Sequence, residues 1–121
     1  FNISHSGEFI LAVFAVGMDI GVDVQEMAEC PDYREIAENF YTAEEAEDVK
    51  NEGPDLFFQY WAAKEAYVKA LGIGLGRGMD FFSVRNEKIA EKDKKDQDWF
   101  LYPVRIKGYA AYVAAHEKGD R

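Results

Sequence analysis

Residues 54–71 read Pro-Asp-Leu-Phe-Phe-Gln-Tyr-Trp-Ala-Ala-Lys-Glu-Ala-Tyr-Val-Lys-Ala-Leu, and this stretch predicts one long helix. Pro54 suits the first helical position, and Asp55 suits the positive end of the helix dipole. Apolar residues recur at helical spacing through the stretch, and Gly72 follows it as a stop signal. The helix therefore offers an apolar face that a sheet can cover.

Strand patterns flank this helix on both sides. Residues 8–16 form a continuous apolar run and residues 20–25 alternate, so the sequence predicts a β-hairpin made of these two segments. After the helix, three strands and a charged loop are predicted, over residues 80–85, 99–106, 109–116 and 88–98. Strands, then helices, then strands favour an α+β fold in which an antiparallel sheet packs against the long helix.

Two short helices are predicted between the first strands and the long helix. Residues 31–40 open with Pro-Asp, which suits the start of a helix. Thr42 with Glu45 three positions later is a capping box, which predicts a second helix to about Asn51. We find no internal repeat or linker and expect a single domain over residues 1–121.

Composition narrows the classes of function. With 48% hydrophobic and 15% aromatic residues, the chain has the composition of a globular protein. A formal net charge of -9 argues against general binding to nucleic acid or to an anionic membrane, so we expect neither as a partner. Cys30 is the one cysteine, so no disulfide can form within the chain, and we expect a reducing, cytoplasmic setting.

Asp23 and Gln25 form the first group of candidate site residues. Strand alternation places their side chains on one face, about 7 Å apart. A carboxylate beside an amide oxygen is a reasonable part of a magnesium site, because hard cations prefer oxygen ligands. The competing interpretation is an ordinary solvated acid on the polar face of a strand.

The long helix carries the second group, Lys64, Glu65 and Lys69. Glu65 and Lys69 are four residues apart, so they can form a simple ion pair along the helix surface. Alternatively, Glu65 holds a metal while the lysines hold phosphates, which is the division of roles that phosphoryl transfer requires. A third group, Ser4, His5 and Ser6, can contact a phosphate or be a polar loop.

In combination and in this order, these segments resemble the Sfp-type 4′-phosphopantetheinyl transferases. The segments that carry the resemblance are Phe1-Asn-Ile-Ser-His-Ser-Gly7, Gly21-Val-Asp-Val-Gln25, Phe40-Tyr-Thr-x-x-Glu45, Trp61-x-x-Lys-Glu-Ala-x-x-Lys69 and Gly72-x-Gly-Leu75. The resemblance implies a magnesium-dependent transfer of 4′-phosphopantetheine from coenzyme A to a serine of an acyl or peptidyl carrier protein.

The resemblance also implies roles for individual residues. Asp23 and Glu65 would be magnesium ligands, and Glu65 would also accept the proton of the carrier serine. Gln25 stands where the family pattern has a glutamate, so the amide would be the third ligand and the site would lose one negative charge.

Coenzyme A phosphates would be bound by the remaining candidate residues. The resemblance assigns this role to Lys64, Lys69 and His5, with Ser4 and Ser6 beside them. Lys64 and Lys69 would in addition offset charge on the leaving group. Arg77 is our candidate for a cationic contact with the carrier protein, since the rest of the chain is acidic.

The chain resembles only the second half of enzymes that are built from two similar halves. We therefore expect it to be part of a longer protein or to pair with itself or another chain. Two alternatives to an enzyme stay open at this point. One is a non-catalytic module that binds coenzyme A or a carrier protein, and the other is a structural domain in which Glu65 and Lys69 only brace a helix.

Overall fold

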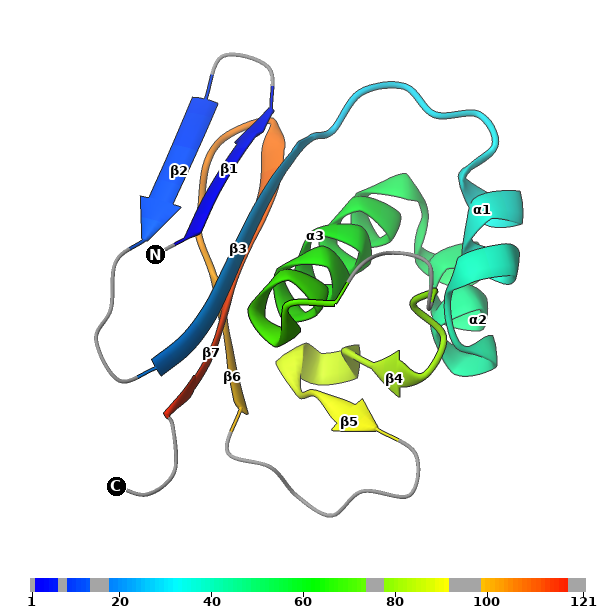
Figure 1. The fold of residues 1–121 in the computed structure, drawn as a ribbon. Coiled ribbons are helices and arrows are strands. Elements are labelled where there is room, and N and C mark those ends of the chain that lie inside the picture. Colours follow the sequence, from blue (N-terminus) through cyan, green and yellow to red (C-terminus); the bar gives the residue numbers. More distant parts are fainter. Residues whose placement is uncertain (1, 7–8, 14–17, 74–77, 92–98, 118–121) are drawn as a thin grey trace.

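The computed structural model describes residues 2–6, 9–13, 18–73, 78–91 and 99–117, and it confirms an α+β fold (Figure 1). In chain order its elements are β1 (Asn2–Ser6), β2 (Phe9–Val13), β3 (Met18–Glu26), α1 (Tyr33–Phe40), α2 (Ala43–Glu52), α3 (Pro54–Leu71), β4 (Phe82–Ser83), a 3-10 turn (Arg85–Glu87), β5 (Ala90–Glu91), β6 (Trp99–Pro103) and β7 (Tyr109–Glu117).

The main sheet is antiparallel and has the order β3-β7-β6, with Asp23 opposite Tyr112. The hairpin predicted from residues 8–16 and 20–25 is wrong. Strand β2 pairs with β1, and β3 pairs with the distant β7. Alternation reveals which face of a strand is buried, but it does not reveal which strand lies alongside.

Strand β3 is covered on both faces. Helix α3 crosses one face of the sheet, and the β1–β2 hairpin lies over the other (Figure 1). The helix approaches so closely at Gly21 that a Cβ there would overlap the backbone oxygen of Ala66. Gly21, Asp23 and Gln25 therefore face α3, while Val22 and Val24 are fully buried on the opposite side.

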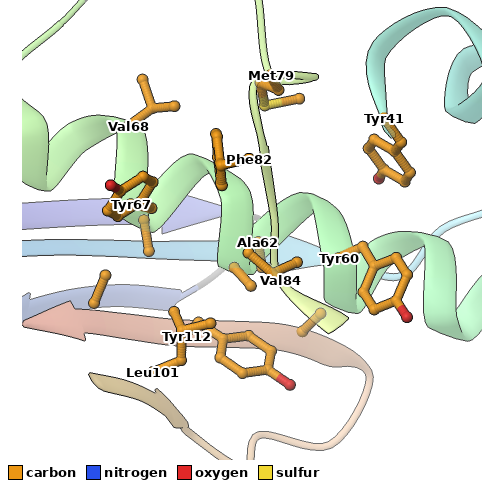
Figure 2. Close-up of a cluster of buried hydrophobic side chains, with 14 of the residues drawn as sticks. Tyr41, Tyr60, Ala62, Tyr67, Val68, Met79, Phe82, Val84, Leu101 and Tyr112 are labelled. Atoms are coloured by element: carbon orange, nitrogen blue, oxygen red, sulfur yellow. The ribbon is translucent and has the colours of Figure 1, made fainter. Parts of the chain in front are cut away.

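The hydrophobic core lies between α3 and the sheet (Figure 2). Tyr67 of the helix packs against the ring of Phe82 at 4.7 Å and against Trp99 at 4.9 Å between centroids. Leu101 and Tyr112 contribute from the sheet side. The core thus fixes the helix against β3, which carries part of the candidate site.

The helix ends follow the local signals in the sequence. At the start of α2, the Thr42 hydroxyl accepts the Glu45 N–H while the Glu45 carboxylate accepts the Thr42 N–H, so the predicted capping box is confirmed. Helix α3 begins at Pro54 and ends at Gly72, whose φ of 73° is readily adopted by glycine. None of the described helices is long and apolar enough to cross a membrane.

The strand predicted over residues 80–85 is largely wrong, because only Phe82–Ser83 pairs, with Ala90–Glu91 of β5. Side chains bind the backbone of this segment instead. The Lys64 ammonium donates to the carbonyls of Met79 and Phe82, and Glu45 accepts the N–H of Val84. The predicted charged loop over 88–98 contains β5, and its residues 92–98 lie outside the described residues.

The strand predicted over residues 99–106 is shorter than expected, because β6 ends at Pro103. A proline is tolerated here since β6 is an edge strand of the sheet. Beyond it, the Val104 N–H still donates to Ala111, and Ile106 forms an isolated bridge with Tyr109. The turn between β6 and β7 uses Gly108, with a φ of 80°.

Candidate functional site

Asp23 lies at the centre of the candidate site. Its side chain projects from β3 toward α3 and is only 3% exposed. The Lys69 ammonium lies 3.0 Å from Asp23 Oδ1 and 3.2 Å from the carbonyl oxygen of Val22. A carboxylate this deeply buried is costly without a counter-charge, and Lys69 supplies one in this structure.

Gln25 holds the other oxygen of Asp23. Its Nε2 donates to Asp23 Oδ2 at 2.8 Å. A carboxylate accepts hydrogen bonds only, so the amide nitrogen must be the atom that faces it. Both oxygens of Asp23 are thereby bound by side chains, one by an ammonium and one by an amide.

Glu65 lies beside this pair on the same side of α3 as Lys69, and it is 9% exposed. Burial raises the pKa of the Glu65 carboxyl, the negative charge of Asp23 raises it further, and Lys69 opposes the rise. Asp23 and Glu65 are therefore close enough to repel each other. The ammonium of Lys69 forms its ion pair with Asp23 of β3, and the predicted brace between Glu65 and Lys69 stays a prediction.

Lys64 does not belong to this site, although it precedes Glu65 in the sequence. Its side chain is 0% exposed, and its ammonium lies 2.8 Å from Glu45 Oε1. The carbonyl oxygens of Met79 and Phe82 lie at 2.7 Å and 2.5 Å. An ammonium has three N–H donors, so these contacts use all of them. In this structure no donor of the ammonium is left for a phosphate, and the prediction that Lys64 contacts coenzyme A stays a prediction.

Ser4, His5 and Ser6 lie on β1, which pairs with β2 and packs near β3. The structure describes their backbone as strand rather than polar loop, and their side chains lie outside what it describes. Arg77 also lies outside the described residues. The predicted phosphate and carrier contacts of these four residues stay predictions.

The oxygen atoms of Asp23 and Glu65 fit a divalent cation. Two nearly buried carboxylates that repel each other gain most from a shared positive ion, and carboxylate oxygens are the ligands that magnesium prefers. Within the described ranges, no three His, Cys, Asp or Glu side chains are grouped to hold a metal. Gln25, which donates to Asp23, is an amide and so does not count among these four residue types.

Two features near the site escaped the sequence analysis. Glu45 looked like a helix cap only, yet it also neutralises Lys64 at full burial. The capping box was the available signal, since it turns the Glu45 carboxylate inward. An apolar hollow of about 200 Å³ also adjoins Gln25 and is lined by Ile36, Phe57, Phe58 and Trp61. Its lining comes from three elements, so no local pattern announces it.

Comparisons with known proteins place this arrangement in a family. A family model described as the 4′-phosphopantetheinyl transferase superfamily matches residues 19–115, a range that includes Asp23, Glu65 and Lys69. The 4′-phosphopantetheinyl transferase Sfp of Bacillus subtilis (strain 168) is 38% identical over 70% of this chain and 38% of its own length. The L-aminoadipate-semialdehyde dehydrogenase-phosphopantetheinyl transferase of Rattus norvegicus is 29% identical over 99% of this chain and 46% of its own length.

A solved structure supports the fold. A holo-(acyl-carrier-protein) synthase from Bacillus anthracis str. Ames, in complex with CoA (3′,5′-ADP), superposes with a TM-score of 0.62 at 23% identity and covers 84% of this chain and 96% of its own. The present chain spans less than half the length of the curated relatives, from 34% to 46%. On the family match and the shared fold together, the chain belongs to the 4′-phosphopantetheinyl transferase superfamily.

Proposed function

We propose that this chain carries the acidic pair and a phosphate-binding lysine of a 4′-phosphopantetheinyl transferase. The enzyme would move the phosphopantetheine arm of coenzyme A onto a serine of an acyl or peptidyl carrier protein. One observation carries the proposal: Asp23 and Glu65, both nearly buried, converge beside Lys69 within the region that the family model matches. Relatives that bear the name of this activity support it.

Asp23 and Glu65 would hold Mg²⁺. Gln25 is the proposed third ligand through its Oε1, while its Nε2 orients Asp23. When bound, magnesium would supply positive charge that neutralises and orients the pyrophosphate of coenzyme A. Substrate or water oxygens would complete the coordination, because magnesium commonly keeps such ligands.

The transfer step is a substitution at phosphorus. The serine hydroxyl attacks the phosphorus atom that bears pantetheine, a new P–O bond forms, and adenosine 3′,5′-bisphosphate leaves with the electrons of the broken pyrophosphate bond. Glu65 would accept the serine proton, a role that its raised pKa favours. Lys69 would offset the charge of the phosphates, and Ser4, His5 and Ser6 would contact them from β1.

The exposed surface and the charge of the chain suggest where a carrier protein and a second chain would bind. Carrier proteins of this kind are typically acidic, as is this chain, so docking requires apolar or locally cationic contact. The hollow beside Gln25 offers such an apolar surface. Self-association is proposed through β6, where Phe100 and Tyr102 stack on each other and are 51% and 52% exposed. A cytoplasmic setting stays part of the proposal.

A transfer assay tests the proposal. The chain is incubated with coenzyme A, Mg²⁺ and an apo carrier protein, and the mass of the carrier is followed. We expect the mass of one phosphopantetheine arm to be added, and chelation of the metal to stop the addition. If no transfer is seen, calorimetry with coenzyme A and Mg²⁺ distinguishes the two alternatives. Binding without transfer would indicate a non-catalytic binding module, an alternative that the amide of Gln25 favours. No binding would indicate a structural domain.

A further inference from the structure

Lys69 occupies a position for which a metal ion would compete. Its ammonium lies 3.0 Å from Asp23 Oδ1, on a carboxylate that is almost completely buried. A cation that binds Asp23 and Glu65 would lie within a few ångströms of this ammonium. Two positive charges at such a distance repel strongly inside a protein. Lys69 and a divalent cation therefore compete for the negative charge of Asp23.

Lys69 is built to move, unlike the lysine that precedes Glu65. Its side chain is 33% exposed, and its ammonium contacts Asp23 and the backbone oxygen of Val22. The long flexible stem of lysine lets the ammonium swing toward solvent at little cost. Gln25 stays bound to the other oxygen of Asp23 and can keep the carboxylate oriented while Lys69 leaves.

We propose that Lys69 is the counter-ion of Asp23 until a divalent cation binds, and that metal binding releases its ammonium to a phosphate of coenzyme A. This inference rests on the proposed function. It makes the binding of metal and of coenzyme A cooperative, because the metal frees the cation that the phosphate needs. It also gives the chain a stable arrangement without metal, in which Asp23 is neutralised internally.

Metal affinity is the first measurement. Mn²⁺ replaces Mg²⁺ as the probe, without coenzyme A, and binding is followed by electron paramagnetic resonance in wild type, Lys69→Met and Lys50→Met. Lys50 is exposed on α2 and is the matched control. We expect Lys69→Met to bind Mn²⁺ at least about fivefold more tightly than wild type, and Lys50→Met to match wild type. Equal or weaker binding by Lys69→Met overturns the inference.

Removal of a nearby positive charge would strengthen Mn²⁺ binding even without movement, so a second measurement follows the wild-type lysine directly. Acetic anhydride labels exposed amines, and mass spectrometry reports the labelling rate of Lys69 relative to that of Lys50. Saturating Mn²⁺ should raise the relative rate at Lys69, and coenzyme A should lower it again. An unchanged or reduced rate with Mn²⁺ alone overturns the release of Lys69, whether or not Lys69→Met folds.

The two failures can be told apart. If neither wild type nor Lys69→Met binds Mn²⁺, the proposed metal site fails, and this inference fails with it. If both bind Mn²⁺ equally and the labelling of Lys69 does not change, the metal site stands and only the release of Lys69 is overturned.

Discussion

Two lysines five residues apart on one helix, Lys64 and Lys69, have opposite environments. Lys64 is completely buried, and its three donors are used by Glu45 and two carbonyl oxygens. Lys69 is one-third exposed and bridges Asp23 and Val22 on the neighbouring strand. The difference shows that the lysines of one short motif can be divided between scaffold and site. Lys64 joins three segments, and Lys69 balances the charge of Asp23, a role that a metal would take over under our proposal.

Glu65→Ala should produce the largest effect and should separate the site from the scaffold. We expect transfer activity to fall by more than about a thousandfold, since the variant loses both a metal ligand and the proposed base. Stability should change little, because Glu65 is repelled by Asp23 in the folded protein. The carrier assay and urea unfolding check the two halves of the prediction. Normal activity would remove Glu65 from the mechanism.

Lys64→Met should lower mainly the stability of the protein, whereas Glu65→Ala lowers mainly its activity. The substitution leaves Glu45 charged and unpaired at full burial, which costs about 3 to 5 kcal/mol of unfolding free energy. Lys69→Met is the matched control and should cost less, because the Lys69 side chain is 33% exposed, so water can reach the position of its ammonium, and Gln25 still donates to Asp23. Urea unfolding measures both. If the two variants lose equal stability, the division between scaffold lysine and site lysine is wrong.

Gly21→Ala tests the close contact between β3 and α3, the two elements that carry the candidate site. A Cβ at Gly21 would overlap the backbone oxygen of Ala66, so α3 must shift away from β3. We expect a loss of about 1 to 3 kcal/mol, as for other overpacked cores, together with weaker Mn²⁺ binding because Asp23 and Glu65 are carried on the two elements that separate. Gly108→Ala is the control: its φ of 80° makes an alanine strained, but the added Cβ meets nothing within 4 Å, so stability should fall while Mn²⁺ affinity does not change. Unchanged metal affinity in Gly21→Ala would contradict this account.

The smallest expected effect is a change with pH in the stability of the Glu65→Gln variant relative to wild type. The pKa of Glu65 is raised above 4.5 in the folded chain, so the folded state binds its proton more tightly than the unfolded state does. Stability from this group is therefore present below pH 4.5 and is lost as pH rises through the raised pKa. Glu65→Gln should match wild type in acid and exceed it in stability above that window. Urea unfolding across this pH range, without metal, measures the difference. A difference that does not depend on pH would contradict the raised pKa of Glu65, which burial causes first and Asp23 second.

Local signals in the sequence predicted the elements well. Helix α3 begins and ends where Pro54 and Gly72 place its boundaries, and the Thr42–Glu45 capping box forms as expected. The alternation of residues 20–25 correctly placed Asp23 and Gln25 on one face. These features depend on residues within four positions of one another, so a short window of sequence contains their physical cause.

Contacts between segments that are distant in the sequence could not be predicted from such a short window. Strand β3 was predicted to pair with its neighbour, but it pairs with β7 at the other end of the described chain. The segment 80–85 alternates like a strand, yet Lys64 and Glu45 take its backbone groups. Burial of a charged pair can outweigh local strand propensity, because an unsatisfied buried charge costs more free energy than the loss of hydrogen bonds between two strands.

The sequence by itself determined the helices, the strand faces and the two acids that we propose as metal ligands. Only the tertiary structure decided which of the two lysines, Lys64 or Lys69, is exposed enough to contact a ligand. Lys69 meets Asp23 across 46 residues of chain, and Lys64 meets Glu45 across an intervening turn and most of a helix. The physical reason is that charge pairing depends on distance and burial in space, and spacing along one helix sets neither of these for residues on different elements.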